Sequence, residues 1–250
     1  MRGMEVKGIL LALLDIPRDL TEEYNRWYDL DHLPEHVSKA DVLTARRYVA
    51  PRDLQVLGGG GSDLTGGHPP YLTMYYLGVP DFAGAEATAL WTTKDRGIIK
   101  AGRFWRSGHV PFSRKWRLGE TFTRASVLVS DEAVPYVGHR GVVVALGRAP
   151  STERRDDARQ WWRDTHLVDL LAVEGVLAAM RFDPVDAGDE DLLLHILLLE
   201  DDPAVVMPRI EGALRYGGAL GRYPAHGGAY ESIAFLPYRT IVPLEYDFEW

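Results

Sequence analysis

The feature that most constrains the fold is an internal repeat at a fixed spacing. The segment from Trp27 to Tyr48, WYDLDHLPEHVSKADVLTARRY, aligns without a gap with the segment from Trp161 to Phe182, WWRDTHLVDLLAVEGVLAAMRF, at an offset of 134 residues. Seven of the 22 aligned positions are identical, whereas chance gives about one or two. The identical pairs are Trp27/Trp161, His32/His166, Leu33/Leu167, Val42/Val176, Leu43/Leu177, Ala45/Ala179 and Arg47/Arg181. We interpret the repeat as a duplicated unit of a helix followed by a strand.

The size and charge of the chain limit the classes of function. A length of 250 residues fits two domains of about 125 residues each. The net charge of −8 argues against a general binder of the nucleic-acid backbone. Basic residues do cluster between Arg103 and Arg117, but aromatic residues are interleaved with them. We interpret this segment as a solvated loop anchored by its rings, and we expect no nucleic-acid partner.

The sequence predicts an intracellular protein without thiol chemistry. It contains no cysteine, which removes thiol nucleophiles, thiolate metal sites and disulfides, and which is typical of the reducing cytoplasm. The apolar run from Gly8 to Leu14 is too short for a membrane span and is interpreted as a buried strand. We therefore expect a cytoplasmic protein with no membrane partner.

Hydrophobic patterning predicts the same order of elements, β-α-β-β-α-β, in each half. A helix should start at Asp19, where Glu22 completes a capping box, and it should kink or restart at Pro34. In the first half, strands are expected at 5–14, 42–49, 71–79 and 120–129, a second helix at 81–93, a long loop at 51–70, and an insertion of loops and short helices at 95–117. In the second half, strands are expected at 141–147, 176–184, 191–200 and 230–236, and helices at 151–171 and 203–220.

This element order predicts an α+β fold made of two ferredoxin-like repeats. Each repeat leaves one face of its antiparallel sheet bare, so the two sheets are expected to pack together as one pseudo-dimeric α/β barrel within a single chain. The predicted organisation is a first repeat over 1–130, a second repeat over 139–236, and a C-terminal tail, 237–250, packed on the barrel. A further homo-oligomer is left open.

The helix text EEYNRWYDLDHLPEHV, followed by VLTARRY, resembles the dimeric α/β-barrel superfamily, and most of all its EthD-type members. Those proteins carry a W-Y-x-x-x-H-x-P helix that leads into a strand of the sarRy/f type. The resemblance covers the helix-strand core of both halves and is weak over the insertion and the tail. It implies the fold more strongly than the reaction, because the superfamily includes lactone isomerases, polyketide cyclases, cofactor-free monooxygenases, accessory proteins and haem enzymes.

His32 is the first candidate for catalysis. Tyr28, His32 and His36 follow one another at i, i+4 spacing, so a continuous helix places them along one edge. Trp27 should lie about 140° around the helix from His32, packed on the sheet. A neutral imidazole suits proton transfer, but a histidine that locks a helix end to its loop is equally compatible with the sequence. Retention of the histidine as His166 favours a structural role for the second copy.

Arginines and two further residues complete the predicted site. Arg47 and Arg181 each lie on an apolar strand face, where they need a carboxylate from the protein or from a substrate. Arg46 is matched by Met180 and is therefore the better candidate for substrate binding. Tyr75 and His195 are candidates for lining a pocket, although a histidine within LLLHILLL also suits a core position. The H-x-x-x-H spacing of His32 and His36 lacks an assignable third ligand, so no metal site is predicted.

These observations favour a cofactor-free enzyme that acts on a small aromatic, polyketide or lactone-like substrate by proton transfer. Isomerisation, cyclisation, dehydration and oxygen-dependent oxidation of a phenol all fit. His32 would be the general acid or base, with Arg46 or Arg47 steadying an anion, while Tyr28, His36, Tyr75, His195, His166 and Arg181 would contact substrate. A non-catalytic binding or accessory protein is the alternative, followed by a haem enzyme, although no haem-specific motif is visible.

Overall fold

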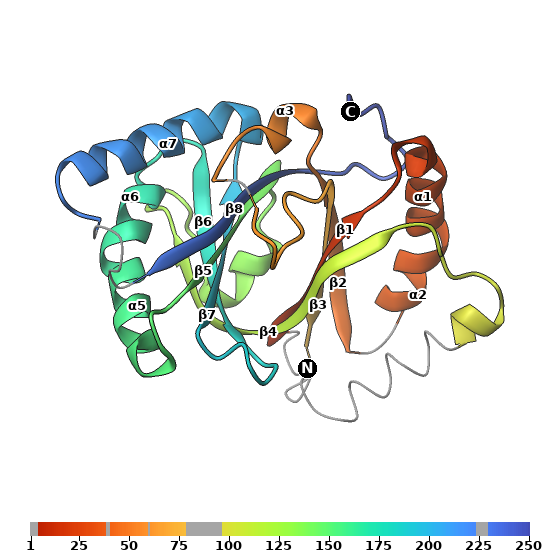
Figure 1. Ribbon diagram of the computed structural model, residues 1–250, viewed down its shortest axis with the longest axis horizontal. Helices are drawn as coiled ribbons and strands as arrows, with labels where there is room; N and C mark the ends of the chain where they lie inside the picture. Colours follow the sequence, from red (N-terminus) through yellow and green to blue (C-terminus); the bar gives the residue numbers. More distant parts are fainter. Residues whose placement is uncertain (1–4, 39–40, 60, 79–96, 224–229) are drawn as a thin grey trace.

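The computed structural model describes residues 5–38, 41–59, 61–78, 97–223 and 230–250. Eight strands form a closed antiparallel barrel, and the helices lie outside it on two opposite sides (Figure 1). The strands are β1 (Gly8–Asp15), β2 (Val42–Val49), β3 (Tyr71–Leu77), β4 (His109–Thr123), β5 (Gly141–Arg148), β6 (Val176–Pro184), β7 (Leu192–Leu199) and β8 (Glu231–Thr240). The mixed α+β class and the antiparallel barrel predicted from the sequence are therefore confirmed.

Both halves have the same strand order. Around the barrel the strands run β1-β3-β2-β8-β5-β7-β6-β4, so the first half reads β4-β1-β3-β2 and the second reads β8-β5-β7-β6. Each half thus places its first and third strands in the centre, as a ferredoxin-like sheet does. The two seams differ in length. β4 pairs with β6 from Trp116↔Pro184 to Thr123↔Ala178, whereas β2 meets β8 only at Tyr48↔Thr240 and Val49↔Arg239.

The core of the barrel is built by alternation along each strand. In β1, Ile9, Leu11 and Leu13 are fully buried inside the barrel, whereas Leu10 and Leu14 face the helices. Because successive side chains of a strand point to opposite faces, each sheet has one interior face and one face covered by helices. The structure therefore has three apolar layers: the barrel interior, and one helix-sheet contact in each half.

The helical segment of each half contains a π-helical turn at the same place. In the first half α1 (Thr21–Trp27) continues through the π turn η2 (Tyr28–His32) into α2 (Leu33–Val37). In the second half α5 (Arg155–Trp161) continues through η5 (Trp162–His166) into α6 (Leu167–Leu171). Pro34 lies in the first turn of α2, where a proline is tolerated, and the second half makes the same turn without a proline. The irregularity therefore comes from the π turn rather than from Pro34.

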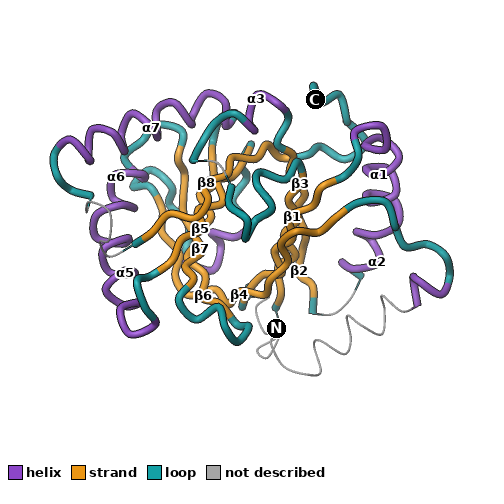
Figure 2. The backbone as a smooth tube through the Cα atoms, viewed as in Figure 1, coloured by secondary structure: helices purple, strands orange, loops and turns teal. Residues whose placement is uncertain are grey.

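Several predicted boundaries differ from the structure. Asp19 lies inside the 3-10 turn η1 (Arg18–Leu20), and no side chain caps α1, so the predicted capping box is wrong. β4 runs from His109 to Thr123, so the end of the predicted insertion, 109–117, is strand, and the end of the predicted fourth strand, 124–129, is not. The remaining short elements are α3 (Arg52–Gln55), η3 (Asp131–Tyr136) and η4 (Thr152–Arg154), and α7 (Pro203–Ala219) is the long helix of the second half (Figure 2). The helix predicted at 81–93 lies outside the described residues.

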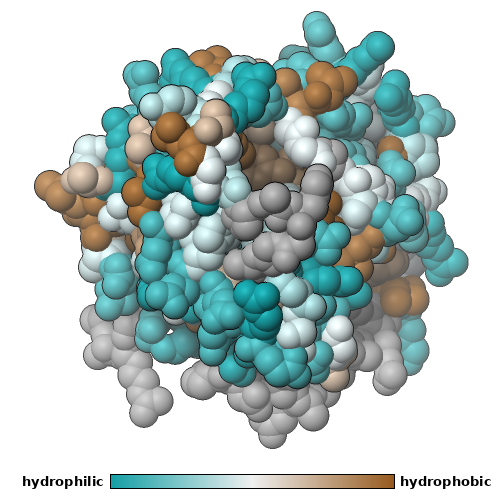
Figure 3. Space-filling view, turned by 60° about the vertical axis from the view of Figure 1, so that its left-hand side comes forward, coloured by the Kyte–Doolittle hydropathy of each residue, from teal (hydrophilic) through white to brown (hydrophobic). Residues whose placement is uncertain are grey.

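The C-terminal segment packs on the first half. β8 extends to Thr240, four residues beyond the prediction, and the chain then crosses to the side of α1 (Figure 1). There Ile241 is buried, and the ring of Trp250 lies 5.6 Å from that of Tyr71. On the face that includes the second half, hydrophobic side chains form small patches between polar ones (Figure 3). No helix in the described part of the chain is long and apolar enough to cross a membrane.

Candidate functional site

A cavity of about 460 Å³ lies in the first half, between the α1–α2 segment and the outer face of β1. We call it the first cavity. Its walls are mostly apolar and aromatic, and its polar groups come from two histidines of the helical segment, three tyrosines, and the segment that leads into β4. The lining residues are Leu10, Ala12, Leu14, Ile16, Tyr24, Trp27, Tyr28, His32, His36, Tyr75, Phe104, Trp105, Arg106, Gly108, His109, Val110 and Ser113. Of the predicted site residues, Tyr28, His32, His36 and Tyr75 are thus brought together.

The π turn sets the geometry of His32. In a π helix a residue aligns with the one five positions away, so the ring of Trp27 stacks on that of His32 at 4.6 Å. The predicted angle of about 140° between them, which assumed a regular α-helix, is therefore wrong. The predicted edge is confirmed, because the His32 ring lies 4.8 Å from the Tyr28 ring and 4.3 Å from the His36 ring. His32 is half-buried at the wall of the cavity.

Two tyrosine hydroxyls meet at the base of the first cavity. The hydroxyl oxygens of Tyr28 and Tyr75 are 2.6 Å apart, and both side chains are only 3% exposed. Burial raises the pKa of Tyr28 above its ordinary value and that of Tyr75 well above it. Both phenols therefore stay protonated around neutral pH and can donate hydrogen bonds. His36, which is 1% exposed, packs its ring 5.5 Å from that of Tyr75.

The segment before β4 closes one side of the first cavity. Arg103 makes a two-pronged ion pair with Asp31, at 2.9 and 2.7 Å, and reaches Glu35 at 3.0 Å. The indole nitrogen of Trp27 donates to the backbone oxygen of Arg103 at 2.7 Å. These contacts hold Trp105 beside Trp27, with ring centroids 5.8 Å apart. The rings of Phe104 and Trp105 thus anchor the start of this segment against Trp27, as predicted, but from His109 on the predicted solvated loop is strand β4.

Arg47 lies beneath the cavity rather than in its wall. Its guanidinium donates to Asp29 at 2.6 Å and to the side-chain oxygen of Asn25, and it lies 4.2 Å from the centre of the Tyr28 ring. The side chains of Arg47 and Asp29 are 4% and 5% exposed. The expected carboxylate partner thus comes from the same half. Asp29 also accepts a hydrogen bond from Tyr246 of the C-terminal segment, at 2.5 Å.

The structure separates Arg46 from His32. Arg46 is on the opposite face of β2 from Arg47, where its guanidinium lies 3.2 Å from Nδ1 of His139 and donates to the backbone oxygen of Tyr136 at 3.4 Å. Nε2 of His139 is in turn 2.9 Å from the Tyr48 hydroxyl. Arg46 therefore joins the barrel to the segment between the two halves. The prediction that it binds substrate together with His32 does not agree with this placement.

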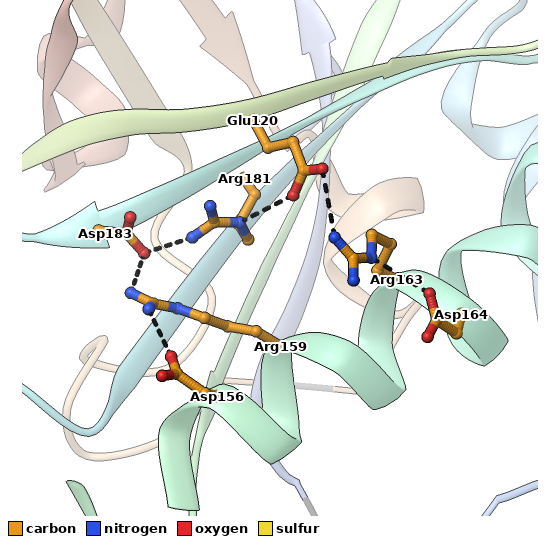
Figure 4. A network of polar contacts seen from close by, with 7 residues as sticks. All are labelled: Glu120, Asp156, Arg159, Arg163, Asp164, Arg181 and Asp183. Atoms are coloured by element: carbon orange, nitrogen blue, oxygen red, sulfur yellow. Dashed lines mark hydrogen bonds and ion pairs between the residues drawn. The ribbon is translucent and has the colours of Figure 1, made fainter. Parts of the chain in front are cut away.

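Arg181 has different partners from Arg47, although the two occupy equivalent positions. The repeat offset matches Asn25 and Asp29 with Arg159 and Arg163, so the acidic partner is missing from the second helix. Arg181 instead pairs with Asp183 at 2.5 Å and lies 3.6 Å from Glu120 (Figure 4). Figure 4 shows this network continuing to Arg159, Asp156, Arg163 and Asp164 on the helical segment. Arg181 is thus part of a surface network and not of a cavity wall.

His195 is a core residue. It is fully buried, and its ring stacks on that of Trp162 with centroids 3.3 Å apart. Strand pairing aligns His195 with Arg181 and Ala145, and in the first half it aligns Thr73 with Arg47 and Ala12. His195 is therefore equivalent to Thr73. It lines neither the first cavity nor the cavity at the equivalent place in the second half, so the substrate contact predicted for it does not agree with the structure.

Comparisons with known proteins identify the fold. No family model and no curated protein matches the sequence. Among solved structures, a proposed chlorite dismutase superposes with a TM-score of 0.57 at 12% identity, over 96% of both chains. A proposed dyp-type peroxidase from Shewanella oneidensis gives 0.56 at 6% identity, over 95% of this chain and 94% of the other. A proposed monooxygenase from Fusobacterium nucleatum gives 0.51 at 11% identity, over 98% and 99%.

These similarities show that the chain has a dimeric α/β-barrel fold of ferredoxin-like type. They cover nearly the whole length of each structure. At such low identity a shared fold carries no assignment of a reaction. The EthD-type resemblance and the origin of the two halves by tandem duplication remain predictions.

The described residues show no prepared haem site. The rings of Trp27, Tyr28, His36 and Phe104 pack around His32, with centroids between 4.3 and 6.3 Å away. A metal-bound histidine normally donates its second ring nitrogen to an acceptor. For His166, the equivalent histidine of the second half, the buried Nδ1 has no hydrogen-bond partner among the described residues. Within the same residues, no group of three His, Asp or Glu is placed to hold a metal ion.

Proposed function

We propose that the first cavity is the active site of an enzyme that acts on a small, largely apolar aromatic, polyketide or lactone-like molecule by proton transfer. The observation that carries the proposal is the position of His32 at the wall of a cavity whose base holds the hydroxyl pair of Tyr28 and Tyr75. A neutral imidazole beside hydrogen-bond donors can move a proton while those donors stabilise the resulting anion. The proposal needs no cofactor.

The walls of the first cavity suit a flat substrate. Trp27, Phe104 and Trp105 supply aromatic faces, and Leu10 and Leu14 of β1 supply apolar side chains. A ring held between such walls is shielded from water, which strengthens each polar interaction made with it. The substrate class follows from this apolar lining rather than from a charged anchor.

In the proposed mechanism His32 takes a proton from a carbon or a hydroxyl of the substrate. The negative charge that develops on the substrate oxygen is stabilised by a hydrogen bond from the Tyr28 or Tyr75 hydroxyl. Arg47, whose charge is paired with Asp29, lies 4.2 Å from the centre of the Tyr28 ring and holds that ring in place. The two tyrosines thus take the role that the sequence had suggested for Arg46 and Arg47.

The neighbouring structures support a small-molecule enzyme in general terms. Their names describe a monooxygenase, a peroxidase and a dismutase. Among the reactions that begin with proton removal from an aromatic substrate, oxygen-dependent oxidation of a phenol is therefore our first choice, ahead of isomerisation, cyclisation or dehydration. We further propose that the two halves are tandem repeats of one EthD-type unit, and that only the first half catalyses.

Two equivalent substitutions test this proposal. A panel of polycyclic phenols and lactones is screened for turnover and oxygen consumption with the wild-type protein and with His32→Ala and His166→Ala. We expect His32→Ala to abolish turnover with little change in melting temperature, and His166→Ala to retain turnover. Equal loss of activity in both variants would contradict a single site in the first half. Ligand binding without turnover by the wild type would favour an accessory protein instead.

A further inference from the structure

The second half contains its own cavity, at the place equivalent to the first. This second cavity has a volume of about 540 Å³ and lies between α5, α7 and the outer faces of β5 and β8. Four of its lining residues match residues of the first cavity by the repeat offset or by strand pairing. The matched pairs are Ala12/Ala145, Trp27/Trp161, His32/His166 and Ser113/Phe235. The position of the cavity is thus shared, although most of its lining differs.

Two glycines make room for the aromatic walls of the second cavity. A Cβ atom at Gly147 would lie 2.0 Å from the ring of Tyr230, and one at Gly217 would lie 2.7 Å from the ring of Tyr223. Each tyrosine ring can take its place only because the facing residue has no side chain. Trp161 joins the two rings, with centroids 5.8 Å from Tyr230 and 6.0 Å from Tyr223. The aromatic wall therefore depends on backbone positions and is not a chance gap in the surface.

The second cavity keeps the histidine, as His166, but lacks the hydroxyl pair that we assign to anion stabilisation in the first. Trp162 replaces Tyr28, and strand pairing places Leu197 where the first half has Tyr75, so the hydroxyl pair is missing. The inner space that Arg47 occupies in the first half is filled here by His195 stacked on Trp162. What remains is a space between rings that can bind a molecule but lacks the paired hydroxyls at the positions of Tyr28 and Tyr75.

The polar groups of the second cavity favour an uncharged ligand. Glu211 and Arg215 both line it from α7, so their opposite charges offset each other. Burial lowers the pKa of His166 to about 4, so its imidazole is neutral at pH 7. A neutral imidazole can donate a hydrogen bond to a ligand or accept one from it. Ser232 offers a hydroxyl on the opposite strand.

We propose that the second cavity binds a flat, uncharged aromatic molecule carrying a hydroxyl group, at a site separate from the first cavity and without chemistry of its own. The ring would stack between Trp161, Tyr223 and Tyr230, and the hydroxyl would meet His166 or Ser232. A molecule of this class is also a substrate or product of the proposed reaction, so the occupancy of the second site would follow its concentration. The binding claim itself does not require that the first cavity be catalytic.

Equivalent alanines allow a matched test with 1-naphthol as the probe. Titration calorimetry of the full-length protein is expected to show two sites for the wild type and one site for either Ala145→Phe, which fills the second cavity, or Ala12→Phe, which fills the first. Quenching of Trp161 fluorescence, measured as the difference between the wild type and Trp161→Phe, should persist in Ala12→Phe and vanish in Ala145→Phe. Naphthoate and naphthylmethylammonium should bind the second site at least tenfold more weakly than naphthol.

Two results would overturn the proposal. The first is an Ala145→Phe variant that folds, as judged by its circular dichroism, and still binds as many equivalents of 1-naphthol as the wild type. The second is a wild-type protein whose Trp161 fluorescence is not quenched when 1-naphthol is saturating. If Ala145→Phe does not fold, Ala145→Leu takes its place in the calorimetric test. A single equivalent that is lost in Ala145→Phe but kept in Ala12→Phe supports the second site while contradicting the first.

Discussion

Replacing Arg47 with methionine should destabilise the protein far more than the same change at Arg181. The two residues are equivalent in the repeat, but their surroundings differ. Arg47 and its partner Asp29 are 4% and 5% exposed. Arg181 is 15% exposed, and its partners Asp183 and Glu120 are 24% and 37% exposed. Each arginine therefore serves as the internal control for the other.

The contacts of each arginine set the expected magnitudes. Removing one partner of a buried ion pair costs about 3–5 kcal/mol, because the other charge stays buried without compensation. Asp29 would still accept hydrogen bonds from Tyr246 and from the backbone of Leu244, so we expect the lower end, about 3 kcal/mol, for Arg47→Met. Asp183 would keep Arg159 in a partly solvated network, so Arg181→Met should cost about 1 kcal/mol.

Urea denaturation of both variants measures the difference directly. The free energy of unfolding should fall by about 2 kcal/mol more for Arg47→Met than for Arg181→Met. Adding Asp29→Asn to Arg47→Met should recover part of the loss, because it removes the uncompensated charge. Equal costs, or a larger cost at Arg181, would refute the claim that Arg47 forms a buried structural pair. A gain of stability in the Arg47→Met variant would refute it as well.

Three further predictions follow from single contacts. First, burial holds the pKa of His166 near 4, so the unfolded chain binds more protons below pH 6.5. Stability should therefore decline between pH 6.5 and pH 4. At pH 4.5 the loss should exceed that of His166→Asn by about 2–3 kcal/mol in a denaturant titration; an identical pH dependence in both proteins would contradict this. Second, Gly147→Ala should lower the melting temperature and weaken 1-naphthol binding in the second cavity only, because the new Cβ would lie 2.0 Å from the Tyr230 ring; an unchanged melting temperature would mean that Tyr230 is not held there. Third, Tyr246→Phe removes a donor to Asp29 and should cost about 1 kcal/mol by urea denaturation, whereas Tyr216→Phe on the exposed face of α7 should cost nothing measurable.

Most strands of the barrel could be predicted from the sequence, because a regular hydrophobic pattern marks them. β2 and β6 match their predicted ranges, and both belong to the repeat that places equivalent residues at equivalent sheet positions. The strand predicted at 120–129 overlaps β4 only at 120–123; the first part of β4 was missed because Arg114 shares a face with Phe112 and Trp116 and interrupts the alternation. Arg114 can occupy that face because Asp189 pairs with it at 2.8 Å, a contact that no local pattern indicates.

The site was predicted in part. The spacing of Tyr28, His32 and His36 indicated one helix edge, and the structure places all three at one cavity. The π turn was not predicted, because helical periodicity assumes 3.6 residues per turn. The sequence does contain a signal for the partner of Arg47. The aligned position is an acid, Asp29, in the first copy and a base, Arg163, in the second. A partner present in only one copy marks the half in which the arginine is buried.

The role of His32 is tested most directly by hydrogen exchange on a flat carbon acid. 2-Tetralone in heavy water exchanges the protons beside its carbonyl, and proton NMR follows the loss of their signal. We predict that the wild-type protein accelerates this exchange over buffer, that His32→Ala removes the acceleration while keeping its melting temperature, and that His166→Ala retains it. Acceleration that is unchanged in His32→Ala, or lost equally in His166→Ala, would contradict a proton-transfer site in the first cavity.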